Sequence, residues 1–208
     1  MRVLVFGDSI GHGLWDERGG WVQRLRSELD ANFMQDFGGL YLDIYNLSIS
    51  GDTSAGIVSR IEREIRARCW PGTPFAIIVA VGTNDAGVSR VHTELEQYRE
   101  NLQNIVESAR SFSDNLLFAG LPPVDEKLTR PWFADETVSF ANDDLQVYER
   151  AAQEICAAQN IPFVPIFERF QAEQLKQNLL SDGLHPNAVG HELIASLVRP
   201  ELDNLLEV

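Results

Sequence analysis

A chain of 208 residues with 44% hydrophobic and 23% charged residues has the length and composition of one globular domain, so we expect residues 1–208 to form a single domain. Its formal net charge of −14 argues against a nucleic-acid partner, because binding a phosphate backbone requires a basic surface. The longest apolar run, residues 75–81, is too short to cross a bilayer, and no signal peptide precedes residue 7. We therefore expect a cytoplasmic protein without an integral membrane segment.

Short runs rich in β-branched and aromatic residues predict the strands of a sheet. They are residues 3–6, 41–47, 75–81, 116–121 and 161–166. The first, third and fourth runs are continuously apolar, as expected for strands that are buried on both faces.

Apolar residues at helical spacing occupy the segments between these runs. They predict amphipathic helices around residues 21–33, 57–65, 95–109, 145–155 and 189–198. Alternating strands and helices are typical of an α/β fold, here three layers in which a five-stranded parallel sheet carries helices on both faces. One of the connections between these elements is unusually long. Residues 122–140 follow the fourth strand, and connections of this length are often functional.

Polar residues follow several of the predicted strands, where ligands bind in open α/β sheets. Ser9 comes directly after the first strand, and Asp182 and His185 lie just before the last helix. Because Asp182 and His185 are three residues apart, they can share one turn, in which the carboxylate holds one imidazole nitrogen. The other nitrogen is then free to take a proton from Ser9. The pattern predicts a catalytic triad of a serine hydrolase.

Acyl transfer also requires hydrogen-bond donors for the oxyanion that develops in the transition state. We expect this oxyanion hole to consist of the Ser9 and Gly51 backbone N–H groups and the Asn84 side-chain amide. Gly51 follows the second strand and Asn84 the third. Asp85 is an alternative triad acid, and we favour for it a role in holding the Asn84 turn through hydrogen bonds to backbone.

The ordered set of these segments resembles the GDSL, or SGNH, hydrolase family, whose four blocks contribute Ser, Gly, Asn and His. Here they are Ser9, Gly51, Asn84 and His185, with Asp182 at the family's acid position and Ile10 replacing its leucine. The resemblance extends from residue 3 to about residue 195. It implies a flavodoxin-like sheet and ester hydrolysis through an acyl-enzyme on Ser9, without a metal or a cofactor.

The substrate is less constrained, because the family acts on lipid, aryl, thio- and acetyl-sugar esters. We expect a small-molecule carboxylic ester or thioester with a small to medium acyl group. Carbohydrate acetylesterase and lysophospholipase or thioesterase activities remain alternatives. We expect Trp15, Trp132 and Phe133 to bind the substrate, because their loops leave the sheet at the edge that carries Ser9. Aromatic faces there would bury apolar substrate surface.

The alternative from a different class is a flavodoxin-like nucleotide-binding module. Gly11 and Gly13 give it some support, but Asp16 stands where a third glycine would be needed, and the Asp–His pair would have no role. Cys69 and Cys156 do not lie in a zinc-ligand pattern, so no metal site is expected.

Overall fold

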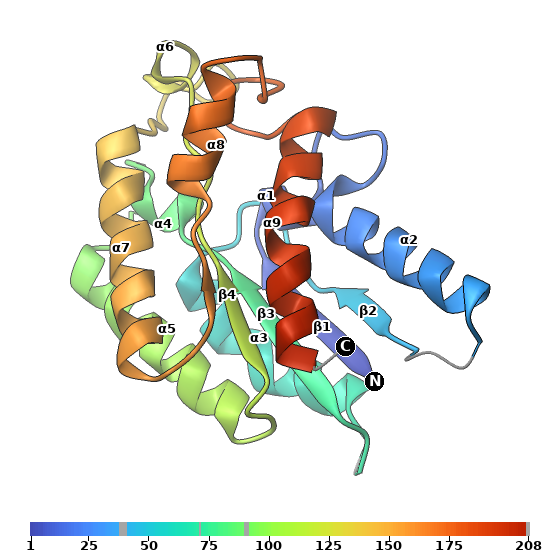
Figure 1. Ribbon diagram of the computed structural model, residues 1–208. Coiled ribbons are helices and arrows are strands. Elements are labelled where there is room, and N and C mark those ends of the chain that lie inside the picture. The colour runs from blue at the N-terminus through green and yellow to red at the C-terminus, as the bar shows by residue number, and fades with distance from the viewer. Residues whose placement is uncertain (38–40, 71, 90–91, 207–208) are drawn as a thin grey trace.

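A five-stranded parallel sheet with the order β2-β1-β3-β4-β5 forms the centre of the computed structural model, which describes residues 1–37, 41–70, 72–89 and 92–206 (Figure 1). The strands are β1 Arg2–Gly7, β2 Asp43–Asn46, β3 Phe75–Ala80, β4 Leu116–Ala119 and β5 Phe163–Val164. All five predicted strands are present, so the predicted α/β fold is confirmed. The second to fifth strands are shorter than predicted, and β5 keeps only two residues.

Helices cover both faces of this sheet (Figure 1). The longer ones are α2 Gly20–Gln35, α3 Ser54–Arg68, α5 Leu95–Arg110, α7 Asn142–Ala158, α8 Phe167–Gln174 and α9 Ala188–Leu206. Short helices follow the ends of strands: α1 Ser9–His12, α4 Thr83–Ala86 and α6 Glu126–Thr129. The five predicted helices correspond to α2, α3, α5, α7 and α9, whereas α8 was not predicted. Among the described residues, no helix combines the length and apolar composition that a bilayer span requires.

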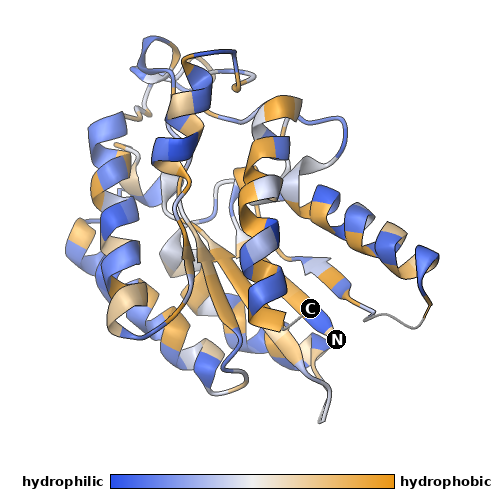
Figure 2. Ribbon diagram, viewed as in Figure 1, coloured by the Kyte–Doolittle hydropathy of each residue, from blue (hydrophilic) through white to orange (hydrophobic). Residues whose placement is uncertain are grey.

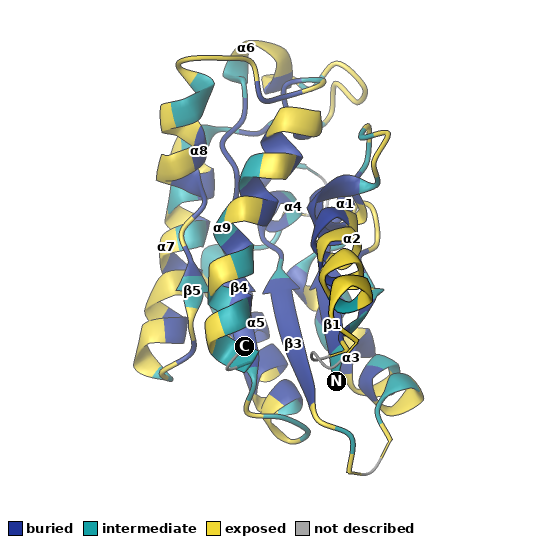
Figure 3. Ribbon diagram, turned by 45° about the vertical axis from the view of Figure 1, so that its right-hand side comes forward, coloured by how far each residue is buried: buried dark blue, intermediate teal, exposed yellow. Residues whose placement is uncertain are grey.

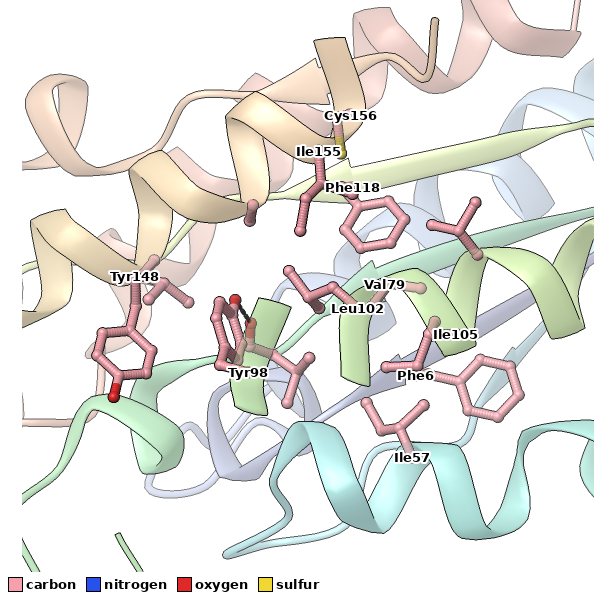
Figure 4. Packing of buried hydrophobic residues seen from close by; sticks show 14 of the residues in the cluster. Phe6, Ile57, Val79, Tyr98, Leu102, Ile105, Phe118, Tyr148, Ile155 and Cys156 are labelled. Atoms are coloured by element: carbon pink, nitrogen blue, oxygen red, sulfur yellow. Dashed lines mark hydrogen bonds between the residues drawn. The ribbon is translucent and has the colours of Figure 1, made fainter. Parts of the chain in front are cut away.

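Two buried clusters, one on each face, attach the helices to the sheet. Alternate residues of β1 separate them: Leu4 and Phe6 pack with α3, α5 and α7, whereas Val3 and Val5 pack with α2 and α9. Figure 4 shows part of the first cluster, with Phe6 beside Ile57 of α3. Apolar residues dominate the strands, and polar residues gather on the outward faces of the helices (Figure 2). The central strands are accordingly buried on both sides (Figure 3).

The long connection of residues 122–140 is ordered by hydrogen bonds. Asn142 exchanges two hydrogen bonds with the backbone of Val124, at 2.9 and 3.0 Å. Ser139 pairs with Val88, in the loop after α4, through backbone bonds of 2.8 and 3.0 Å. The connection is therefore fixed to the edge of the sheet at which the strands end.

Candidate active site

Ser9 is presented by a tight turn at the end of β1. Asp8 is the N-cap of α1, and its carboxylate accepts a hydrogen bond of 2.9 Å from the Ile10 N–H. Ser9 is the first residue of this helix, which fixes the direction of its side chain. Gly11 lets the turn approach the loop after β2, because a Cβ at that position would collide with the Ser48 hydroxyl.

The structure brings Ser9, His185 and Asp182 together in one hydrogen-bonded chain. The Ser9 Oγ lies 2.9 Å from Nε2 of His185, and Nδ1 of His185 lies 2.7 Å from Oδ2 of Asp182. The other Asp182 oxygen accepts the backbone N–H groups of Leu184 and His185, at 2.9 and 2.7 Å. Burial opposes ionisation of Asp182, but these hydrogen bonds outweigh it and lower its pKa to about 2. Asp182 is therefore a carboxylate that can hold the Nδ1–H of His185.

The turn that carries Asp182 and His185 is anchored on both sides. Asn187 caps α9, because its Oδ1 accepts the N–H groups of Val189 and Gly190 at 3.0 and 3.1 Å. Gly183 has a φ of +90°, and a Cβ there would press against Leu128 of α6. A residue without a side chain is thus needed for this turn to pack against α6.

Gly51 and Asn84, the expected oxyanion donors, line the same pocket as Ser9 and His185. Gly51 has a φ of +80° in the loop after β2, and Asn84 belongs to α4. The Asn84 amide donates a hydrogen bond of 2.8 Å to the carbonyl of Asp52. This bond uses one of its two amide hydrogens and fixes the orientation of the side chain, so the second hydrogen has a defined direction.

Asp85 does not take part in the Ser9–His185–Asp182 chain. Its buried carboxylate instead accepts hydrogen bonds from the backbone N–H and the hydroxyl of Ser54, at 2.9 and 2.6 Å. It therefore does bond to backbone, as expected, but to the backbone of a neighbouring loop.

The pocket beside Ser9 has a volume of about 460 Å³. Its apolar wall consists of Leu14, Trp132, Val138, Phe140 and Leu184. Ser50, Thr53 and Ser89 are polar residues of its lining. Three of the apolar residues belong to the long connection, as that segment's position predicted.

Of the three aromatic residues expected to bind substrate, the structure places one in the wall of this pocket. The ring of Trp132 lies 6.0 Å from that of His185. Phe133 packs edge-on against Trp132 but is 66% exposed, and it does not line the pocket. Trp15 is 64% exposed with a φ of 64°, and its neighbour Leu14 lines the pocket in its place. The loops that contain Trp15 and Phe133 do reach the pocket, but these two side chains do not line it, and their contact with substrate stays a prediction.

Sequence reasoning also missed Leu14, Val138, Phe140 and Leu184. Each of them neighbours a residue or segment that had been singled out, but loop residues lack the periodicity that reveals which side chains face inward. In the described part of the chain, no group of three or more His, Cys, Asp or Glu side chains is arranged to hold a metal ion.

A parallel α/β sheet with a serine, a histidine and an aspartate in contact at its C-terminal edge is an arrangement that suits a hydrolase, and family membership makes this protein a carboxylic ester hydrolase. The chain belongs to the GDSL-like lipase/acylhydrolase family, whose model matches residues 5–193. This membership decides against the nucleotide-binding module considered from the sequence.

Curated relatives cover almost the whole chain. Esterase TesA of Pseudomonas aeruginosa is 27% identical, over 99% of this chain and 90% of that protein. An isoamyl acetate-hydrolyzing esterase 1 homolog of Bos taurus is 24% identical, over 97% of this chain and 81% of that protein.

Solved structures share the fold. A lipase/acylhydrolase from Enterococcus faecalis superposes with a TM-score of 0.79 at 24% identity, covering 98% of this chain and 95% of that one. A catalytic mutant of the acetylxylan esterase Axe2 from Geobacillus stearothermophilus has a TM-score of 0.76 at 20% identity, covering 97% of this chain and 93% of that one. At these identities the likeness establishes the fold.

Proposed function

We propose that this protein is a serine esterase that hydrolyses carboxylic esters of small to medium acyl groups through an acyl-enzyme on Ser9. The observation that carries the proposal is the hydrogen-bonded chain from Ser9 through His185 to Asp182, at 2.9 and 2.7 Å, which opens into a pocket with an apolar wall.

In this mechanism the Ser9 Oγ attacks the carbonyl carbon of the ester while Nε2 of His185 takes its proton. The Asp182 carboxylate holds Nδ1–H and stabilises the imidazolium that forms. His185 then gives the proton to the departing alkoxide, which leaves as the alcohol. A water molecule, activated by the same histidine, attacks the acyl-enzyme and releases the acid.

The negative charge that develops on the carbonyl oxygen needs donors that are already in place. The Ser9 and Gly51 N–H groups and the Asn84 amide are the candidates. The bond from Asn84 to the Asp52 carbonyl supports this assignment, because it restricts the amide before substrate arrives. A fixed donor does not have to reorganise in the transition state.

The chemistry of the pocket supports a neutral acyl group. Among the described residues of its lining, His185 is the one acidic or basic side chain. We infer that Trp132 contributes most to selectivity, since its indole lies beside the His185 ring and forms part of the apolar wall. Acetyl esters fit these features, and the names of both an isoamyl acetate-hydrolyzing relative and an acetylxylan esterase neighbour refer to acetyl esters.

A second candidate is an acetylated sugar. Ser50, Thr53 and Trp132 line one pocket, and side chains of these types suit the hydroxyls and the apolar face of a carbohydrate.

Two measurements test the proposal. A fluorophosphonate should label Ser9, seen as a mass shift of the peptide that contains it. Ser9→Ala should abolish that shift and lower kcat with p-nitrophenyl acetate by several orders of magnitude while leaving the melting temperature nearly unchanged. Near-normal turnover by Ser9→Ala would refute the assignment. Rates with acetyl, butyryl and octanoyl esters and with acetylated xylooligosaccharides then separate the two substrate candidates.

A further inference from the structure

The two donors Gly51 and Asn84 come from loops after different strands, so their spacing has to be set by contacts between those loops. Asn84 supplies one contact, through its bond to the Asp52 carbonyl. The next residue along the chain supplies another. Asp85 is fully buried, and its carboxylate receives both the backbone N–H and the hydroxyl of Ser54, the first residue of α3.

We propose that Asp85 is a positioning residue of the esterase site, which holds the Gly51 loop and the Asn84 turn at the distance that the oxyanion requires. This inference rests on the proposed function. It assigns to Asp85 no contact with substrate, because its carboxylate is engaged by Ser54 and Asp85 does not line the Ser9 pocket.

The hydrogen bonds around Ser54 make this connection rigid. Asn101 of α5 donates a bond of 2.9 Å to the Ser54 hydroxyl, which directs the hydroxyl hydrogen towards Asp85. Both side chains are buried. Asp85 also places a carboxylate at the N-terminus of the 15-residue helix α3, where the helix dipole favours a negative group. Burial raises the pKa of the Asp85 carboxyl, and the bonds from Ser54 act in the opposite direction.

A second set of contacts attaches the loop that contains Gly51 to α3. Arg60 of α3 donates to Oδ2 of Asp52 through two nitrogens, at 2.6 and 3.0 Å. The other Asp52 oxygen accepts the Thr53 N–H at 3.0 Å. The segment from Gly51 to Ser54 is thus fixed to α3, and Asp85 fixes α3 to the Asn84 turn. A shift of Asp85 would move one donor relative to the other.

The test compares Asp85→Asn with Ser54→Ala, the double variant of both, and a matched control, Glu149→Gln. Glu149 is also a carboxylate that accepts backbone N–H groups, those of Leu121, Ile166 and Phe167, each at 3.2 Å. It lies on α7 and does not line the Ser9 pocket. For each variant, kcat and KM with p-nitrophenyl acetate, the melting temperature, and the affinity for a short alkyl boronic acid are measured. The boronate forms a tetrahedral adduct on Ser9 and so reports on the oxyanion donors.

In Asp85→Asn, the new NH₂ group faces the N–H and hydroxyl of Ser54, which are themselves donors. The contact between the Asn84 turn and α3 is therefore weakened. We expect kcat of Asp85→Asn to fall by about 10- to 100-fold, less than the 10²- to 10³-fold typical of deleting a donor, with KM changed less than about twofold. Boronate affinity should fall in parallel. Ser54→Ala should show a smaller loss, and the double variant should be no slower than Asp85→Asn, because both residues act through one contact. Glu149→Gln should melt at a lower temperature with kcat preserved.

Several results would overturn the positioning role. One is a folded Asp85→Asn, or a folded Ser54→Ala if the first variant does not fold, with the kcat and boronate affinity of the wild type. Another is a Glu149→Gln variant that loses kcat in the same proportion to its loss of melting temperature, which would indicate a general loss of rigidity. Failure of the proposed function is recognised separately, because the wild-type protein would then neither hydrolyse the ester nor be labelled at Ser9.

Discussion

Replacing Asp8 with asparagine should stabilise the protein at neutral pH and leave its stability in acid nearly unchanged. Asp8 is 2% exposed, and its carboxyl is ordinarily ionised above a pKa of 3.8. Burial raises that pKa to about 6, against the bond from the Ile10 N–H and the nearby charge of His185, which lower it. The folded protein therefore binds this proton more tightly than the unfolded chain does.

The size of the effect follows from the two pKa values. A difference of about 2 pKa units corresponds to about 3 kcal/mol of unfolding free energy. Because the folded-state pKa is the higher one, this stabilisation is fully present below about pH 4 and is lost as the pH rises through 6. Asparagine never ionises and can still accept the Ile10 N–H. Asp8→Asn should therefore exceed the wild type by about 3 kcal/mol more at pH 8 than at pH 4.

Urea unfolding of both proteins at pH 4 and pH 8 measures this difference directly. Asp125→Asn is the matched control, since Asp125 is the N-cap of the equally short helix α6 and its carboxylate accepts the Lys127 N–H on the surface. Asparagine can still accept the Lys127 N–H, so the effect of this substitution on the unfolding free energy should be small. Equal changes for Asp8→Asn at pH 4 and pH 8, or a loss of stability at pH 8, would refute the reasoning.

Further substitutions test the site and the core. Asn84→Ala should lower kcat by about 10²- to 10³-fold with little change in KM, because the amide acts mainly in the transition state; a raised KM with normal kcat would make Asn84 a substrate-binding residue instead. Trp132→Ala should change the order of rates among acetyl, butyryl and octanoyl esters, whereas Phe133→Ala, outside the pocket lining, should preserve it. Burial lowers the pKa of His191 to about 4, and neither ring nitrogen has a hydrogen-bond partner among the described residues. The stability that depends on neutral His191 is complete above pH 6.5 and is lost as the pH falls through 4. In His191→Leu the decrease in unfolding free energy over that range should be smaller by up to about 3 kcal/mol, and an unaltered decrease would contradict the burial argument.

The parts of the fold that could be predicted are those with strong periodicity or local geometry. The apolar runs of β1, β3 and β4 and the five long amphipathic helices were recognisable because tertiary contacts and pattern agree. Helix α8 was not, since only Phe167 and Phe170 of its eight residues are buried. The second and fifth strands differ most from their predicted lengths. They lie at the edges of the sheet, where a strand pairs with one neighbour only.

In the candidate site, too, features with local geometry could be predicted and features that depend on tertiary contacts could not. Ser9, Asp182 and His185 could be predicted to meet, because parallel strands end at one edge and an Asp three residues before a His forms a local turn. The direction of a loop side chain is not local. Trp15 adopts a left-handed backbone conformation that no spacing rule predicts, and its neighbour Leu14 lines the pocket instead. Asp85 accepts its hydrogen bond from Ser54, which lies 31 residues earlier in the chain, and no local pattern indicates such a pair.

Ser9 and His185 touch across a separation of 176 residues, and the strand that presents Ser9 lies inside the sheet between β2 and β3. Under the proposed mechanism, a nascent chain emerging from the ribosome would contain its nucleophile long before the histidine that activates it. Ester hydrolysis would then begin only after His185 has reached Ser9, so a fluorogenic ester could report on completed folding. Inactivation by heat or denaturant should likewise follow loss of the whole tertiary structure rather than fraying of one end.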